Sequence, residues 1–222
     1  MKPPRLDARL RVVADCVPHC ALAADIGADH GKLTAWLLYH KRCERMIASD
    51  ISAASRAKAR ALFHCLGLSE RVTISDAEGL HALAQPAQAV IISGLGGGTI
   101  ADMLAQDVDL NGAALILSPH TELPRLRDAL SRRSYRLTKE LVVKAEGRFY
   151  QVWQAVPGEM RLTEKERALG INLGATFSAV PADYLRWQLK VTRNWHGAEA
   201  VTLRGWIKER IADEEGDHSG SL

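Results

Sequence analysis

Short apolar runs alternate with segments of helical periodicity through the first 157 residues of this chain. Apolar residues recur at helical spacing from Leu6 to Val17, and Pro18 ends that segment. The expected strands lie at residues 21–24, 45–51, 72–77, 88–93 and 113–118, and the expected helices between and after them lie at residues 32–40, 53–66, 98–105 and 122–134. Such alternation predicts an α/β domain built on a parallel sheet.

Two partly alternating segments, residues 135–145 and 148–156, are joined at Glu146-Gly147 and predict an antiparallel hairpin. The sheet is therefore expected to have seven strands with the last one reversed, in a domain of residues 1–157. Residues 158–222 are expected to form a small appendage, a hairpin of two helices. Three of the five tryptophans lie in this appendage, where packing of a small core is favoured over base stacking.

The turn Asp25-Ile26-Gly27-Ala28-Asp29-His30-Gly31 lies between the first expected strand and the next helix. A turn of this kind brings backbone N–H groups and a helix N-terminus to the carboxyl edge of a parallel sheet, where nucleotide-like cofactors bind. Asp29 stands where the dinucleotide motif G-x-G-x-x-G has its second glycine. Two carboxylates would repel a pyrophosphate but not the sulfonium and ammonium groups of S-adenosylmethionine. The turn therefore favours a methyl donor over NAD.

Acidic residues also end the next two expected strands. Asp50 lies 25 residues after Asp25, where a carboxylate bonds the ribose of an adenosine, and Asp76 is expected to bind the adenine amino group. The predicted cofactor contacts are Asp25, Gly27, Asp29, His30, Asp50, Ile51, Asp76, Ala77 and Gly94. An Asp at a strand end can instead cap the following helix, as Asp50 would do ahead of Ser52, and the two roles can coexist.

Length and composition fit one full core and a small extra unit. The chain has 222 residues, of which 47% are hydrophobic, so a domain of about 150 residues can form a complete core. It has no apolar run of about 18 residues and no apolar stretch at its start, which favours a cytoplasmic protein without a membrane partner. Cys16-x-x-x-Cys20 lacks a second ligand pair, so we expect reduced thiols and no metal.

Positive charge is unevenly distributed along the chain. Residues 1–157 carry 20 lysines and arginines against 16 acids, while residues 158–222 carry 9 against 10. Basic residues cluster after the fifth expected strand, and the RNA-binding residues predicted from that cluster are Arg125, Arg127, Arg132, Arg133 and Arg136. Such a group suits a phosphate backbone, although a solvated charged face is the simpler alternative.

These motifs resemble those of the bacterial tRNA adenine-22 N1-methyltransferases. The likeness spans roughly residues 5–157 and rests on Asp25-Ile26-Gly27-Ala28-Asp29-His30, on Ser93-Gly94-Leu95-Gly96-Gly97 and on the hairpin after Tyr135. It implies a class I, Rossmann-like methyltransferase that uses S-adenosyl-L-methionine and methylates N1 of an adenine in tRNA, at position 22 of the D-arm. Leu95 replaces the family's usual Met, and Ser118-Pro119-His120 stands where Gln-Pro-Asn is common.

Two alternatives stay open beside this resemblance. The same fold and donor could serve another RNA site, a small molecule or a protein, or the chain could be a binding module without turnover. The sequence does not fix the oligomeric state, and a monomer is favoured.

The implied reaction needs little acid–base chemistry, because N1 of adenine carries a lone pair and no proton. The enzyme must align the reacting atoms and reach a base that is unpaired or flipped out. Asp29 is predicted to be catalytic by stabilising the cationic product at its N6 amino group, and contact with the donor's ammonium is the equal alternative. His30 is expected to orient the loop. His120, the second predicted catalytic residue, is expected to face the target base.

Overall fold

The computed structural model describes residues 2–171 and 182–217, and it contains the strands and helices expected from the sequence. The strands are β1 (Cys20–Ile26), β2 (Cys43–Ser49), β3 (Val72–Ser75), β4 (Ala89–Leu95), β5 (Ala114–Pro119), β6 (Tyr135–Ala145) and β7 (Arg148–Pro157). The helices are α1 (Ala8–Cys16), α2 (Lys32–Tyr39), α3 (Ala53–Cys65), α4 (Gly97–Leu104), α5 (Leu123–Arg132), α6 (Glu164–Leu169), α7 (Ala182–Val191) and α8 (Ala198–Asp217). The unexpected α6 begins at a capping box formed by Thr163 and Glu166.

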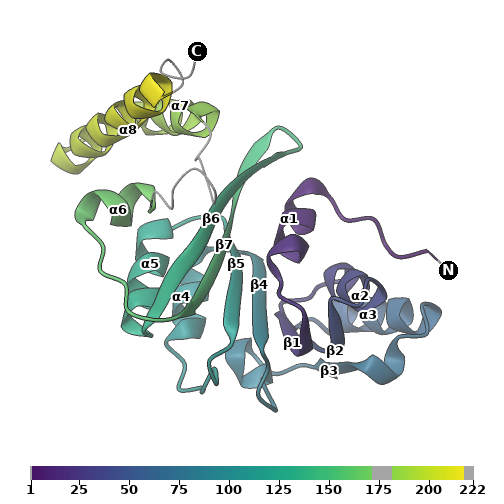
Figure 1. Ribbon diagram of the computed structural model, residues 1–222. Coiled ribbons are helices and arrows are strands. Elements are labelled where there is room, and N and C mark those ends of the chain that lie inside the picture. The colour runs from purple at the N-terminus through teal and green to yellow at the C-terminus, as the bar shows by residue number, and fades with distance from the viewer. Residues whose placement is uncertain (1, 172–181, 218–222) are drawn as a thin grey trace.

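The seven strands form one sheet in the order β3-β2-β1-β4-β5-β7-β6 (Figure 1). Neighbours among β1 to β5 pair in parallel. The last strand, β7, pairs antiparallel with both β5 and β6, which confirms the predicted reversal. Because β6 then points the same way as β5, the tip of the β6–β7 hairpin rises at the carboxyl edge of the parallel strands.

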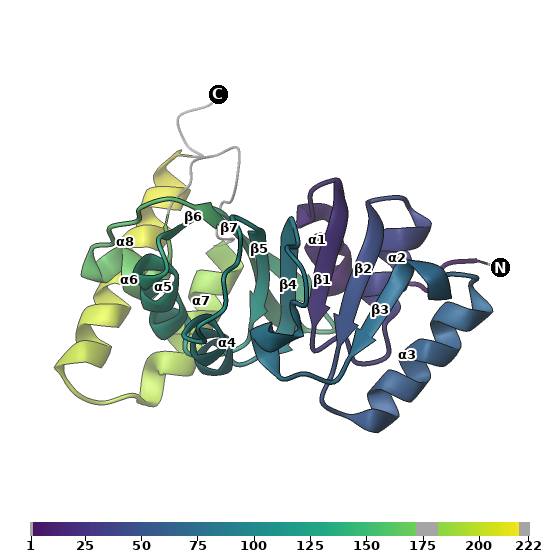
Figure 2. The same cartoon turned by 90° about the horizontal axis from the view of Figure 1, so that it is seen from below.

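Each face of the sheet carries its own hydrophobic cluster. The cluster under α1, α2 and α3 includes Val13, Leu37 and Phe63, while the cluster under α4 and α5 includes Ile100 and Leu130. Figure 2 shows the sheet lying between α1 and α2 on one side and α4 and α5 on the other. Burial on both faces explains why the strands read as apolar runs rather than as alternating patterns.

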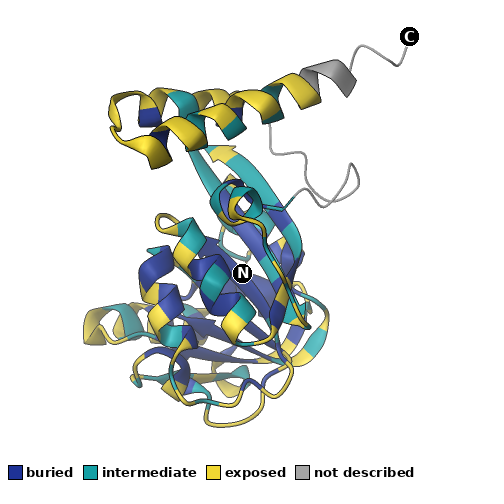
Figure 3. Cartoon of the chain, turned by 90° about the vertical axis from the view of Figure 1, so that its left-hand side faces the viewer, coloured by how far each residue is buried: buried dark blue, intermediate teal, exposed yellow. Residues whose placement is uncertain are grey.

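The C-terminal helices form a small unit of their own. Leu169, Tyr184, Leu185 and Ile207 are its buried apolar residues, and Trp206 packs against them. Figure 3 shows α7 and α8 as a largely exposed pair standing apart from the buried sheet. Core packing, which the sequence favours for these tryptophans, describes Trp206. Trp187 is 42% exposed but packs on Phe149 and Tyr184, whereas Trp195 is 52% exposed.

A buried ion pair ties this unit to the sheet domain. The guanidinium of Arg127 on α5 pairs with the carboxylate of Glu140 on β6, and both side chains are almost fully buried. Arg127 also donates to the carbonyl of Arg167 in α6 and stacks on the ring of Trp153. Glu140 accepts from the backbone N–H of Ile171. The pair therefore joins α5, α6, β6 and the start of the connection to α7.

Candidate functional site

The turn after β1 is held in a left-handed backbone conformation at three positions. Gly27 and Gly31 have φ values of 74° and 69°, and Asp29 has a φ of 49°. A Cβ at position 31 would lie 2.5 Å from the ring of Phe63, so a larger residue does not fit there. The backbone N–H of Gly27 donates to the carbonyl of Ser49 at 2.8 Å. The turn is thereby fixed against the carboxyl end of β2.

Asp25 ends β1 as a buried acid. Its carboxylate is 3% exposed and accepts a hydrogen bond from Thr34 Oγ1 at 2.7 Å. Burial raises the pKa of Asp25 from 3.8 to about 6, although the hydrogen bonds from Thr34 oppose this rise. In the described part of the chain no cationic side chain forms an ion pair with Asp25. A bound cation would therefore stabilise a charge that the protein leaves unpaired.

Asp50 connects the turn to the start of α3. One carboxylate oxygen accepts from the backbone N–H of Asp29 at 2.9 Å, and the other accepts from the backbone N–H of Ser52 at 2.8 Å. The N-cap of α3 is Ser52, whose hydroxyl accepts from Ser55 N, so Asp50 is not the capping residue. Next to it, Ile51 is 74% exposed. An acid beside an exposed apolar side chain at the sheet edge suits the ribose and adenine of a nucleoside.

Asp29 and His30 form an exposed acid–imidazole pair. His30 Nδ1 lies 2.5 Å from Asp29 Oδ2, and the hydroxyl of Ser55 donates to Asp29 Oδ1 at 3.2 Å. Partial burial acts to raise the pKa of Asp29, but the hydrogen bonds from His30 and Ser55 outweigh it and hold this pKa below its usual value. Asp29 is therefore ionised at neutral pH. The contact with His30 orients the Asp29 carboxylate, and the expected role of His30 in orienting the loop stays a prediction.

Asp76 and Ala77 follow β3 at the same edge. The Asp76 side chain is 78% exposed and lies 3.7 Å from Nη2 of Arg56 on α3. Arg56 also donates to the backbone carbonyl of Asp50 at 2.8 Å, so one arginine holds the ends of β2 and β3 together. Asp76 thus has an exposed carboxylate near the end of β2, where Asp50 lies. No sequence motif indicates the role of Arg56.

A second group lies where β4 and β5 end. Arg9 donates to the hydroxyl of Ser93 at 2.7 Å, and its guanidinium lies 5.5 Å from the centre of the Tyr150 ring. The rings of Tyr150 and His120 meet edge to face at 5.7 Å. Gly94, with a φ of 84°, lies beside Arg9, because a Cβ there would be 3.7 Å from Nη1. Burial and the nearby charge of Arg9 lower the pKa of His120, so its imidazole is neutral at neutral pH.

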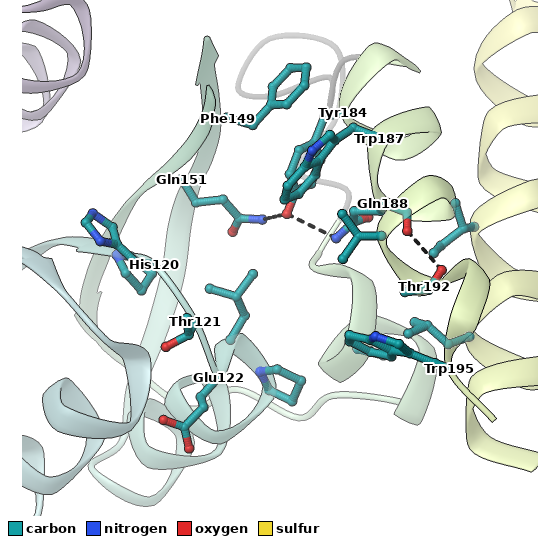
Figure 4. A pocket seen from close by; sticks show the side chains of 17 residues that line it. His120, Thr121, Glu122, Phe149, Gln151, Tyr184, Trp187, Gln188, Thr192 and Trp195 are labelled. Atoms are coloured by element: carbon teal, nitrogen blue, oxygen red, sulfur yellow. Dashed lines mark hydrogen bonds between the residues drawn. The ribbon is translucent and has the colours of Figure 1, made fainter. Parts of the chain in front are cut away.

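Two hollows open along this edge. The smaller, about 270 Å³, is lined by Arg9, Asp25, Asp29, His30 and Ser93, among others. The larger, about 450 Å³, lies between the segment that follows β5 and helix α7 (Figure 4). His120 lines the larger hollow and Arg9 lines the smaller one, so the contacts of Tyr150 with both residues connect the two.

The residues predicted to bind RNA do not form one surface. Arg127 is fully buried in its pair with Glu140, so a phosphate contact is not expected for it. Arg125 pairs with Asp102 at 2.5 Å and with Glu122 at 3.3 Å, which neutralises its charge.

The other three predicted residues, Arg132, Arg133 and Arg136, lie at the end of α5 and the start of β6. Arg133 donates to the carbonyl of Val108 at 2.6 Å. Neighbouring Tyr135 donates its hydroxyl to the carbonyl of Ala113, just ahead of β5, which places this group at the amino edge of the sheet. That edge is opposite the turn after β1.

Among the described helices, none combines the length and the apolarity needed to cross a membrane. Within residues 2–171 and 182–217, no three histidine, cysteine or acidic side chains gather into a group that could hold a metal ion.

Comparison with known proteins connects this geometry to an activity. Residues 6–153 match a family described as a methyltransferase domain. The chain is 30% identical over 158 residues to the tRNA (adenine(22)-N(1))-methyltransferase of Bacillus subtilis, a match that covers 70% of this chain and 66%, slightly less than two thirds, of that relative. The crystal structure of the B. subtilis M1A22 tRNA methyltransferase TrmK superposes with a TM-score of 0.82 at 25% identity, covering 93% of this chain and 99% of that one.

A Streptococcus pneumoniae protein in complex with S-adenosyl-L-methionine is also similar. Its TM-score is 0.77 at 25% identity, and the match covers 93% of this chain and 100% of that one.

Proposed function

The chain belongs to the methyltransferase family that includes the bacterial tRNA (adenine(22)-N(1))-methyltransferases, and from this premise we propose that it methylates N1 of adenine 22 in tRNA with S-adenosyl-L-methionine as donor. The observation that carries the proposal is the meeting of Asp25, Asp50 and Gly94 at one sheet edge. Asp25 and Gly94 come from the two motifs that carry the family resemblance, and the pairing of β1 with β2 and β4 brings them together with Asp50.

The residues at this edge fit the donor. Asp50 and Asp76 offer carboxylates to a ribose and to an adenine amino group, and exposed Ile51 offers an apolar surface to the adenine ring. Arg9 and Asp25 line one hollow with opposite charges, as the carboxylate and ammonium of a methionine moiety require. When bound, the donor supplies an electrophilic methyl group on a sulfonium.

The side chains around the target position have separate tasks. N1 of adenine attacks through its lone pair, so alignment contributes more than proton transfer. Ionised Asp29 is placed to stabilise the positive charge that develops on the base. Neutral His120 can accept or donate a hydrogen bond to the base without adding charge. Gly94 leaves room for a base to approach the backbone near the end of β4.

The direct test is methylation of tRNA by the purified protein. Nucleoside mass spectrometry of the treated tRNA should show N1-methyladenosine, and a transcript with guanine at position 22 should show none. A methylated product in the second transcript would move the target to another site. Methylation of neither transcript, with tight binding of the donor, would favour a binding module instead.

Donor binding is expected to weaken in acid because of Asp25. Its pKa of about 6 means that about a tenth of the free protein carries the ionised carboxylate at pH 5, and that form attracts the donor's ammonium. Affinity for S-adenosyl-L-methionine should therefore fall about tenfold between pH 7 and pH 5. Calorimetric titration measures this, with Asp25→Asn as the control that should bind weakly at every pH. The same pH dependence in both proteins would contradict the assignment.

We expect tRNA to lie over the carboxyl edge, where Lys144 and Arg148 stand exposed at the tip of the β6–β7 hairpin. Reversing both residues to Glu should lower tRNA affinity and flatten its dependence on salt, since each lost phosphate contact reduces the slope of the log–log plot by about 0.7–0.9. The matched control is Arg132→Glu with Arg136→Glu, which makes the same change in charge at the opposite edge. A larger effect of the control pair would place the RNA at the amino edge.

A further inference from the structure

The larger hollow is formed by parts of the chain that lie far apart in sequence. Its first wall runs from Pro119 at the end of β5 to Pro124 at the start of α5, together with Phe149 and Gln151 of β7. The second wall is the inner face of α7 and the turn after it. Figure 4 shows His120, Thr121 and Glu122 across the space from Gln188 and Trp195. The volume of about 450 Å³ is larger than a single nucleobase needs.

Aromatic side chains from both walls line the hollow. Phe149, Tyr184 and Trp187 contact one another with ring centres 5.6 to 5.7 Å apart, and Tyr184 and Trp187 are stacked. Trp195 lines the hollow and is 52% exposed, although a tryptophan is among the costliest side chains to leave in water. Exposed aromatic rings in a hollow are the usual platform on which proteins stack unpaired bases of RNA.

The hollow also contains hydrogen-bonding capacity that the protein does not use. The side-chain amides of Gln151 and Gln188 both donate to the hydroxyl of Tyr184, at 2.7 and 3.0 Å. The other amide atom of Gln188, Oε1, is buried and has no hydrogen-bond partner in the described part of the chain. A buried acceptor without a donor is destabilising, and rotation of the Gln188 side chain toward the hollow would offer it to an N–H group of a base.

The hollow continues directly from the proposed methylation site. His120 forms part of its wall, Tyr150 contacts His120, and Arg9 lies over Tyr150 while bonding Ser93 beside Gly94. A base at Gly94 and a base in the hollow would thus be separated only by the side chains of Arg9, Tyr150 and His120. Adjacent nucleotides of a single strand can span that interval once their bases are unstacked.

We propose that this hollow is a second base-binding site, which holds a nucleobase next to the methylated adenine in the RNA substrate. The inference rests on the proposed function, because it needs an RNA with an unpaired target base. A base held between Trp195 and the His120 segment would keep the strand open and help to offset the cost of extracting the adenine from its stack.

Equilibrium tRNA binding in the presence of S-adenosylhomocysteine tests the proposal. Trp195→Ala should weaken binding by roughly 5- to 150-fold, the range found when a base loses its aromatic partner, and Trp195→Phe should restore most of the affinity. The matched control is Val201→Ala, because Val201 is 62% exposed on α8 and does not line the hollow. Donor affinity should be unchanged in all three variants.

Abasic substitutions in the tRNA identify the base. At one position next to the target, removal of the base should weaken tRNA binding by the native protein. It should not weaken tRNA binding by Trp195→Ala further, because that variant already lacks the contact with this base. The proposal would be overturned if the losses of affinity from Trp195→Ala and from base removal were additive at every position next to the target. It would also be overturned if they were non-additive only at the target adenine itself. Failure of the proposed function would be seen separately, as absence of N1-methyladenosine with the native protein.

Discussion

Asp29→Asn is expected to slow methyl transfer by about a hundred- to a thousandfold, the usual cost of removing one preorganised electrostatic contact. The substitution keeps the size of the side chain and an acceptor oxygen for Ser55. It deletes the charge that we propose stabilises the cationic product. The measurement is single-turnover methylation at saturating tRNA and donor, where affinity no longer contributes. Affinities for both ligands should change far less than the rate.

Two other results would change this assignment. A variant that loses donor affinity but reaches the native rate at saturation would make Asp29 a ligand of the donor's ammonium. A variant with native rate and affinity would leave His120 as the next residue to test. Ser55→Ala is a suitable control, because it removes one hydrogen bond to Asp29 while preserving the charge.

Breaking the buried pair of Arg127 and Glu140 is expected to destabilise the fold by about 3–5 kcal/mol, since one charge would remain buried without its partner. Glu140→Gln tests this, with the free energy of unfolding measured in urea. Replacing both residues with Arg127→Met and Glu140→Leu should recover part of the loss, because it removes both buried charges, although the carbonyl of Arg167 and the N–H of Ile171 lose their partners.

The exposed pair of Lys165 and Glu209 provides the comparison. It joins α6 to α8 at 2.8 Å, and its side chains are 40% and 63% exposed. Lys165→Ala should cost less than about 1 kcal/mol. If Glu140→Gln and Lys165→Ala lower the free energy of unfolding equally, burial does not make the loss of an ion-pair partner more costly.

Local sequence patterns predict most of the fold and the acidic residues of the candidate donor-binding site. The alternation of apolar runs and helical segments specifies the β–α units, because burial on both faces of a parallel strand requires continuous apolar residues. Asp25, Asp50 and Asp76 each end a strand, and parallel strands bring such ends to one edge. Their convergence follows from the chain's periodicity, whereas their individual roles toward a ligand remain predictions.

Other features depend on contacts between distant residues. Arg9 reaches Ser93 across 84 positions, and Tyr150 reaches Arg9 and His120 from β7, so no local motif signals this group. The burial of Arg127 follows from how α6 packs on α5 and β6, which its basic neighbours in sequence do not indicate.

The sequence by itself determined the order and type of the elements and the acidic residues at the ends of the first three strands, since spacing and turn chemistry act over a few residues. The tertiary structure alone decided which charges are available to a ligand and which edge they occupy. Arg132 and Arg136 lie at the amino edge because α5 runs back across the sheet. Trp195 faces His120 across the larger hollow because α7 packs against the β6–β7 hairpin. Direction and packing of whole elements, rather than local propensity, set these positions.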